Sequence, residues 1–163
     1  MSKWDNCVII EIMKQKYIDL YMNWAESAAH MSHARRLQVG AVIVKDDTVI
    51  SYGYNGMPAG WDNDCENIIG YEKEQPVYKT KPEVLHAESN AISKLAKSSN
   101  SGDGADIFIT HAPCLDCAKL IYQSGIRRVW FGQHYRDDAG VKFLTASGVA
   151  VVTPEMQEFA KTH

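Results

Sequence analysis

Apolar residues recur along the chain at two spacings, which predict helices and strands. The apolar positions 18, 21, 22, 25, 28 and 29 have helical spacing, so a helix is predicted over about residues 17–33. The β-branched run 39–44 and the segment 48–52 flank Asp46-Asp47, a pattern typical of a β-hairpin. Residues 53–82 are rich in glycine, asparagine and aspartate, which predicts a long loop that is functional or, alternatively, a flexible insertion.

The second half of the chain alternates between the two patterns. Helices are predicted over residues 86–97, 114–123 and 139–146, and a last helix begins at Pro154. Strands are predicted over residues 105–110, 127–131 and 149–152. This alternation indicates an α/β fold with a central sheet of about five strands and helices on both faces. We expect one domain over residues 1–163, with residues 1–16 as a loose N-terminal arm or an oligomer contact.

Charge and cysteine content narrow the class of protein. The net charge is -3, which argues against a nucleic-acid-binding protein, since such proteins usually present a basic face. The sequence shows neither a secretory leader nor an apolar stretch long enough to span a membrane, so we expect a cytoplasmic protein with reduced thiols. In that compartment, a close cysteine pair favours metal or redox chemistry over a structural disulfide.

Two short motifs carry the candidate chemistry. They are His86-Ala-Glu88 and Pro113-Cys114-Leu-Asp-Cys117. Each is weak alone, because H-x-E arises by chance and C-x-x-C also occurs in redox pairs and structural zinc sites. Together, His86, Cys114 and Cys117 supply three ligands that zinc prefers and leave a tetrahedral ion one open position, which is typical of a catalytic site. Both groups fall at predicted helix starts, where the helix dipole favours a thiolate.

Glu88 distinguishes a catalytic site from a structural one. Residues two apart point to nearly opposite sides of a helix, so His86 and Glu88 can serve one site only near the helix end. There, Glu88 is better placed to exchange protons with a water molecule than to act as a fourth ligand. H-x-E combined with P-C-x-x-C is the pattern of zinc nucleobase deaminases. The alternative is a zinc-stabilised domain without activity, which has no need of Glu88.

From about residue 34 to residue 131, the chain resembles the deoxycytidylate (dCMP) deaminases. The matching pieces are residues 39–44, 53–58 with Gly60, 86–92 and 110–119. The resemblance implies a three-layer α/β/α cytidine-deaminase-like fold with a mixed sheet. It also implies deamination of dCMP to dUMP, the precursor for thymidylate synthesis, with one Zn²⁺ per subunit held by His86, Cys114 and Cys117 and with Glu88 as the proton shuttle. The small size is similar to that of viral or bacterial members.

The same resemblance implies partners and leaves alternatives. Members of the family are usually homo-oligomers, often hexamers. Many are activated by dCTP and inhibited by dTTP, which bind, together with Mg²⁺, at the glycine-rich loop region. The alternatives within the superfamily are deaminases of free cytidine or deoxycytidine and of tRNA adenosine. The acidic net charge argues against the tRNA enzyme.

Residues outside the two motifs are expected to bind the substrate. Asn55 matches a family asparagine that contacts the sugar, although an asparagine beside glycine is also typical of a left-handed turn. Arg36 precedes the first predicted strand, while Tyr135 and Arg136 follow a strand end, where ligand sites of open α/β sheets lie. We expect these three residues to bind the 5′-phosphate, and we add Ala87 to the substrate-binding residues. Arg35, Arg127 and Arg128 are the alternative candidates for phosphate binding.

The remaining histidine and cysteine candidates are expected to play minor roles. His111 competes with His86 for the metal, but only His86 is accompanied by Glu88, so we expect His111 in the pocket lining. Cys7 and Cys65 could contribute to a second, structural zinc site. Neither lies in a paired C-x-x-C or H-x-x-x-H spacing, which favours free thiols.

Overall fold

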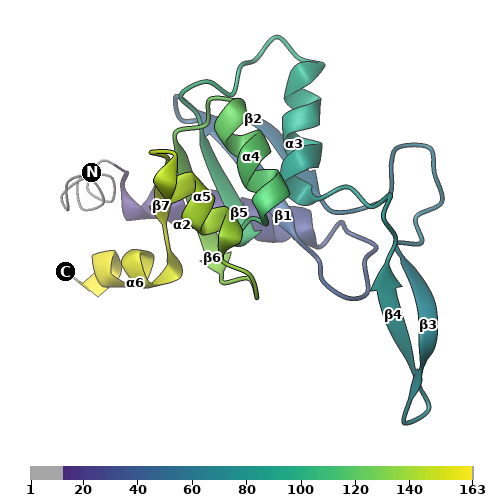
Figure 1. Cartoon of the computed structure of the whole chain (residues 1–163). Helices are drawn as coiled ribbons and strands as arrows, with labels where there is room; N and C mark the ends of the chain where they lie inside the picture. The colour runs from purple at the N-terminus through teal and green to yellow at the C-terminus, as the bar shows by residue number, and fades with distance from the viewer. Residues whose placement is uncertain (1–12, 163) are drawn as a thin grey trace.

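The computed structural model describes residues 13–162, which form a five-stranded sheet between two layers of helices (Figure 1). The strand order is β2-β1-β5-β6-β7. The strand β1 (Gly40–Lys45) is antiparallel to β2 (Thr48–Tyr54) and to β5 (Asp106–His111). The strands β5, β6 (Arg128–Gln133) and β7 (Ala150–Val152) are parallel to one another. The sheet is therefore mixed, and the expected three-layer α/β/α architecture is confirmed.

Alternate strand residues face two separate cores. The helices α3 (Ala87–Ala96), α4 (Leu115–Gln123) and α5 (Ala139–Ala146) cover one face, where Ile43 and Ile107 are buried. The helices α2 (Gln15–Ala29) and α6 (Pro154–Thr162) cover the other, where Val42, Phe108 and Trp130 are buried. Burial on both faces explains why the strands are continuous apolar runs instead of alternating ones. None of the helices formed by residues 13–162 has both the length and the apolar character needed to cross a membrane.

Most predicted element boundaries agree with the structure to within two residues. The exception is α2, which ends at Ala29 and not at residue 33. The Ser32 hydroxyl accepts a hydrogen bond from the Ala34 N–H and donates one to the Asn55 carbonyl, so this segment turns toward the loop after β2. Of the expected arm at residues 1–16, residues 1–12 lie outside the described part of the chain, and residues 15–16 belong to α2.

The prediction of a loop over residues 53–82 is wrong for the second half of this range. There, β3 (Glu66–Glu72) and β4 (Gln75–Thr80) form a two-stranded hairpin that projects from the body of the protein (Figure 1). Its turn residues, Lys73 and Glu74, have φ values of 46° and 64°, as a type I′ turn requires. The turn lacks the usual asparagine–glycine pair, and a register shift between Ile68 and Gly70 interrupts the alternation of the strand. Because of these two irregularities, the sequence pattern does not predict the hairpin.

Two glycines allow helix starts to pack closely against neighbouring segments. A Cβ atom on Gly53 would lie 2.3 Å from the carbonyl oxygen of Ala87, the first residue of α3. A Cβ atom on Gly140, in α5, would lie 2.1 Å from the carbonyl oxygen of Pro113, which precedes α4. Both separations are shorter than any real Cβ contact. Glycine at these positions therefore sets where α3 and the segment before α4 can lie.

Candidate active site

His86 and Cys114 occupy equivalent places at the starts of two helices. His86 is the N-cap of α3 and Cys114 is the N-cap of α4, and both have extended backbone conformations with ψ values of 156° and 169°. Gly56 and Leu85 form an isolated antiparallel bridge, with N–H to carbonyl distances of 3.1 and 2.8 Å, which fixes the segment before His86. Because neither residue continues the helical path, their side chains can meet a group beyond the helix ends.

Three donor atoms converge there with the spacing of a zinc site. The Nδ1 atom of His86 lies 3.5 Å from the Sγ atom of Cys114 and 3.4 Å from that of Cys117. Zinc–sulfur bonds of about 2.3 Å and zinc–nitrogen bonds of about 2.0–2.1 Å, at tetrahedral angles, imply a nitrogen–sulfur separation of about 3.5 Å. The group therefore fits Zn²⁺. No second cluster of three such residues occurs among residues 13–162, and His111 lies outside this one.

The electrostatics of the cysteine pair favour a metal-binding thiolate. A hydrogen bond with Cys117, followed by one with His86, lowers the pKa of Cys114 to about 4. Cys114 also caps a helix, whose N-terminal dipole stabilises negative charge. The same hydrogen bond, together with burial, raises the pKa of Cys117. Without an ion the pair therefore favours one thiolate, on Cys114, and Cys117 has to release its proton when a metal binds.

Glu88 is a buried carboxyl group beside this cluster. It lies in the first turn of α3, is only 4% exposed and lines the same pocket as His86 and Cys114. Burial raises the pKa of Glu88 to about 7. A carboxyl group with a pKa near neutrality is suited to accept and to return a proton. Because α3 begins only at Ala87, the structure brings His86 and Glu88 to one pocket despite their spacing of two residues.

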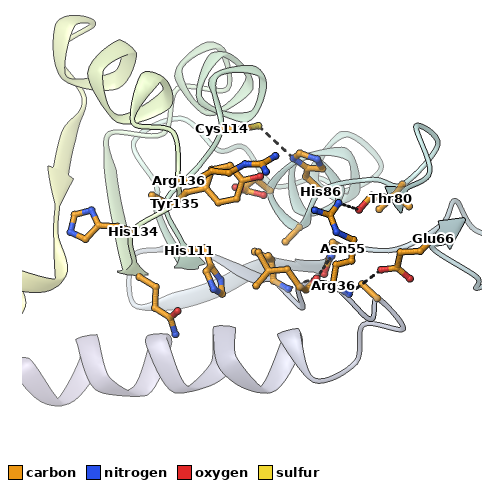
Figure 2. A pocket seen from close by; sticks show the side chains of 18 residues that line it. Arg36, Asn55, Glu66, Thr80, His86, His111, Cys114, His134, Tyr135 and Arg136 are labelled. Atoms are coloured by element: carbon orange, nitrogen blue, oxygen red, sulfur yellow. Dashed lines mark hydrogen bonds between the residues drawn. The ribbon is translucent and has the colours of Figure 1, made fainter. Parts of the chain in front are cut away.

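The pocket has a volume of about 480 Å³ and lies where β5 and β6 end (Figure 2). This volume is within the range of small-molecule sites, about 300–1,000 Å³. Besides His86, Glu88 and Cys114, its lining includes every expected substrate-binding residue: Arg36, Asn55, Ala87, Tyr135 and Arg136. The segments that carry Arg36 and Arg136 are a hundred residues apart in sequence and meet only in the folded chain.

The two pocket arginines differ from their rivals in their contacts. Arg36 donates a hydrogen bond of 3.1 Å from Nη1 to the Thr80 hydroxyl, and the Arg136 guanidinium lies 5.6 Å from the centre of the Tyr135 ring (Figure 2). Neither arginine forms an ion pair with any residue in the range 13–162. Their charge therefore faces the pocket without a counter-ion from the described part of the chain.

The three alternative arginines form ion pairs with carboxylates of the protein. Arg35 forms an ion pair of 2.7 Å with Asp64 and does not line the pocket. Arg128 makes two hydrogen bonds to the Asp106 carboxylate, at 2.7 and 2.6 Å, and Arg127 lies 3.4 Å from the same group. Asp106 and Arg128 begin β5 and β6, at the end of these strands opposite the pocket. The fold therefore separates Arg127 and Arg128 from the site, whereas Arg35 lies beside it with its charge paired to Asp64 and Glu66.

The side chain of Asn55 is held in the pocket wall by two hydrogen bonds. Its Oδ1 atom accepts a hydrogen bond of 2.8 Å from the Val39 N–H, and its Nδ2 atom donates one of 2.7 Å to the Leu37 carbonyl. One N–H of the Asn55 amide remains available to a ligand. The alternative reason for an asparagine here, a left-handed turn, is wrong, because Asn55 has no positive φ.

His111 and Cys65 lie apart from the metal-binding group. His111 lines the pocket with its Nδ1 atom 2.9 Å from the Thr110 hydroxyl, and burial lowers its pKa. Cys65 is a buried free thiol outside any cluster of metal-binding residues within the described chain. Cys7, its proposed partner in a second zinc site, lies among residues 1–12, outside the described part.

The pocket also contains residues that sequence reasoning missed, notably Glu66, Thr80 and His134. Glu66 and Thr80 belong to the hairpin that the sequence pattern did not reveal, so no signal pointed to them. His134 directly precedes Tyr135, and its position after a strand end was a usable signal.

Known proteins are similar to this chain over most of its length. Residues 15–133 match the profile of the cytidine and deoxycytidylate deaminase zinc-binding region. The dCMP deaminase of the cyanophage S-TIM5, solved in complex with dCMP and dUMP, is 40% identical, with a TM-score of 0.77 over 86% of this chain and 98% of that one. ComE operon protein 2 of Bacillus subtilis is 35% identical, over 85% of this chain and 71% of its own length. The deoxycytidylate deaminase of enterobacteria phage T2 is also 35% identical, over 60% of this chain and 70% of its own length.

These likenesses extend beyond the two short motifs. The matched region contains His86, Glu88, Cys114 and Cys117 as well as the loop with Asn55 and the β3–β4 hairpin. Since the match covers well over half of the sequence, the chain belongs to the cytidine and deoxycytidylate deaminase family.

Proposed function

We propose that this protein is a zinc-dependent deaminase that hydrolyses dCMP to dUMP and ammonia and so supplies dUMP for thymidylate synthesis. One observation carries the proposal: a single pocket is lined by His86 and Cys114 of the metal-binding group, by Glu88, and by two arginines that form no ion pair within residues 13–162. The 40% identical cyanophage enzyme, a dCMP deaminase, supports the same substrate. A deaminase of free nucleosides has no need of the arginines, because its substrate has no phosphate.

His86, Cys114 and Cys117 would hold the zinc ion. Their donor atoms already have the separations that a tetrahedral ion imposes, and three protein ligands leave one position for water. A bound zinc ion supplies Lewis-acid chemistry by lowering the pKa of a water molecule from about 15.7 toward about 7.

Glu88 moves two protons during the reaction. The oxygen of water adds to C4 of cytosine, and Glu88 takes a proton from that water and delivers it to ring N3. Glu88 then transfers the second proton of the water from the new hydroxyl group to the amino group at C4. The C4–N bond breaks, ammonia leaves, and the uracil carbonyl forms. One carboxylate suffices because the transfers are successive.

Ala87 and Asn55 are proposed to orient the base and the sugar. Ala87 is the first residue of α3, where backbone N–H groups have no acceptor within the helix, so its N–H can donate to the base. The free N–H of the Asn55 amide can donate to a sugar hydroxyl, and the bonds of that amide to residues 37–39 hold it in place.

Arg36, Tyr135 and Arg136 are proposed to bind the 5′-phosphate. The planar guanidinium group donates two parallel hydrogen bonds to phosphate oxygens, and the Tyr135 hydroxyl adds a neutral donor. The stacking of Arg136 on the Tyr135 ring restricts both side chains before the ligand arrives.

Regulation and assembly are part of the same proposal. We propose a cytoplasmic homohexamer that dCTP activates and dTTP inhibits, each bound with Mg²⁺. A second pocket of about 310 Å³, which includes His33, Tyr54, Gly56 and Lys94, lies along the glycine-rich loop and supports an effector site there. Isotope-labelled dCTP binding and analytical ultracentrifugation test these two points.

Ammonia release from four substrates, compared side by side, tests the proposed function. The substrates are dCMP, deoxycytidine, CMP and a tRNA stem-loop that contains adenosine. We expect dCMP to be the best substrate, with deoxycytidine far weaker. Equal turnover of deoxycytidine would refute phosphate recognition, and preferential turnover of the stem-loop would support the tRNA alternative.

A further inference from the structure

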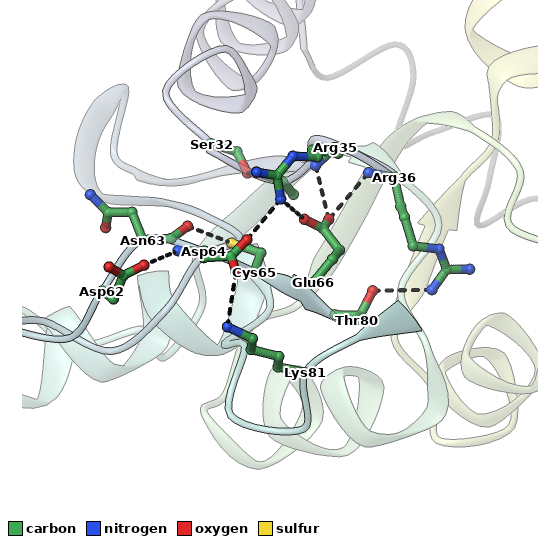
Figure 3. A network of polar contacts seen from close by, with 11 residues as sticks. Ser32, Arg35, Arg36, Asp62, Asn63, Asp64, Cys65, Glu66, Thr80 and Lys81 are labelled. Atoms are coloured by element: carbon green, nitrogen blue, oxygen red, sulfur yellow. Dashed lines mark hydrogen bonds and ion pairs between the residues drawn. The ribbon is translucent and has the colours of Figure 1, made fainter. Parts of the chain in front are cut away.

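The base of the β3–β4 hairpin holds the segment that carries Arg36 (Figure 3). Glu66 is the first residue of β3, Thr80 is the last residue of β4, and the two are directly paired across the hairpin. Both line the pocket together with Arg36. The hairpin is therefore a wall of the site as well as a projection from the body.

Glu66 fixes the main chain of this segment. Its Oε1 atom accepts hydrogen bonds from the backbone N–H groups of Arg35 and Arg36, at 2.8 and 3.2 Å. Glu66 is only 3% exposed, and a buried carboxylate is stable only if hydrogen bonds and opposite charge compensate it. The Arg35 guanidinium, 3.6 Å from Oε2, supplies that charge.

Thr80 fixes the side chain of Arg36. Its Oγ1 atom accepts one hydrogen bond of 3.1 Å from Nη1 of Arg36. The guanidinium group has five N–H donors, so most of them remain for a phosphate. Glu66 thus holds the backbone of Arg36, and Thr80 holds its guanidinium group.

The charges around this base leave Arg36 as the uncompensated cation. Arg35 and Lys81 form ion pairs with Asp64, at 2.7 and 3.2 Å, and Arg35 also approaches Glu66. Of Arg35, Arg36 and Lys81, only Arg36 forms no ion pair with another residue in the range 13–162. An anion that enters the pocket therefore meets Arg36 and not a neutralised pair.

We propose that Glu66 and Thr80 are positioning residues for phosphate recognition, through which the hairpin determines the preference for a nucleotide over a nucleoside. The inference rests on the proposed function, since it assumes that Arg36 binds the 5′-phosphate of dCMP. An arginine held in its binding geometry loses less side-chain freedom when the ligand binds, which increases affinity. Neither Glu66 nor Thr80 touches the reacting atoms in this account.

Thr80→Val tests the proposal with little risk to folding, because valine keeps the shape and removes the acceptor. We expect kcat/KM for dCMP to fall about threefold to tenfold, the cost of ordering one long side chain when the ligand binds. The loss should appear in KM, because a contact far from the reacting atoms is equal in the ground state and the transition state. Deoxycytidine turnover and zinc content should not change.

Glu66 provides a second pair of variants. Glu66→Gln keeps an acceptor for both N–H groups and should retain most of the dCMP preference, whereas Glu66→Ala should lose it. Glu72→Gln, in the exposed part of the same strand, is the matched control for the change of charge, and Thr48→Val, in β2, is the control for Thr80→Val. Both controls should behave like the wild type.

A double-mutant cycle separates positioning from a general structural role. If Thr80 acts through Arg36, Thr80→Val should cost nothing further in an Arg36→Ala background. Additive losses, an equal loss on both substrates, or no loss for Thr80→Val would overturn the inference. If Arg36→Ala abolishes the dCMP preference while Thr80→Val preserves it, only the inference fails. If the wild type turns over deoxycytidine as well as dCMP, the proposed function itself fails.

Discussion

Arg36 and Arg136 come from distant parts of the sequence and line one pocket, and neither forms an ion pair with residues 13–162. A charged hydrogen bond to a phosphate contributes about 1.5–3 kcal/mol. Replacing either arginine with alanine should therefore lower kcat/KM for dCMP about tenfold or more, with deoxycytidine almost unaffected. Steady-state ammonia release with both substrates measures this difference.

Arg127→Ala is the matched control for these two variants. The Arg127 side chain is largely exposed and lies at the opposite end of the sheet. The Arg127→Ala variant should turn over dCMP and deoxycytidine at the wild-type rates. If the pocket variants lose activity equally on dCMP and deoxycytidine, these arginines support the fold and do not read the phosphate.

The metal-binding group joins the starts of two helices, α3 and α4. An ion that binds only the native chain stabilises it in proportion to the logarithm of its concentration. Treatment with a chelator should therefore abolish turnover and lower the melting temperature, and added Zn²⁺ should restore both. Cys117→Ser should lose the ion, whereas Cys65→Ala should keep one zinc per chain by elemental analysis. Retention of zinc in Cys117→Ser would contradict the proposed ligand set.

Gly140 provides a test of helix placement. An alanine there would place its Cβ atom against the Pro113 carbonyl, next to Cys114. Overpacking of this kind costs about 1–3 kcal/mol, and here it should also weaken zinc binding because it displaces the segment before α4. Gly70→Ala is the control, since nothing lies within 4 Å of its added carbon atom. Chemical denaturation and metal titration measure the stability and the zinc affinity of the two variants. Equal values for both variants would show that the close packing at Gly140 has no effect on the site.

The elements that could be predicted from the sequence are those with regular patterns. The strands β1, β5 and β6 are continuous apolar runs, and α4 is bounded by Pro113 and Gly125, so their types and approximate limits were evident. The β3–β4 hairpin was not, because its turn uses lysine and glutamate in a left-handed conformation that normally favours glycine or asparagine. Consequently the metal-binding motif was evident from spacing, but the role of Glu66 and Thr80 in the pocket wall depends on tertiary contacts that no local pattern encodes.

At the scale of the whole molecule, the fold places a stabilising ion pair and the pocket at opposite ends of the sheet. Asp106 and Arg128 are buried at the amino ends of β5 and β6. Breaking a buried pair of this kind costs about 3–5 kcal/mol, because the remaining charge is left uncompensated. Asp106→Ala should therefore lower the free energy of unfolding by that amount while the folded fraction keeps normal kcat and zinc content.

Lys142→Ala removes one partner of the exposed Lys142–Asp138 pair and is the control. It should cause no measurable change, because exposed ion pairs contribute little. Urea denaturation followed by activity assays at 25 °C compares the two variants. A loss of kcat in folded Asp106→Ala would show that the two ends of the sheet are coupled.

The central claim is that Glu88 moves protons beside a zinc ion during dCMP deamination. Glu88→Gln keeps the size of the side chain and removes its ability to accept a proton, so the most direct measurement is dCMP turnover by this variant with its zinc content determined on the same sample. We expect one zinc per chain, a melting temperature no lower than that of the wild type and a loss of turnover of at least about 100-fold. Activity within a few-fold of the wild type, with zinc still bound, would contradict the account.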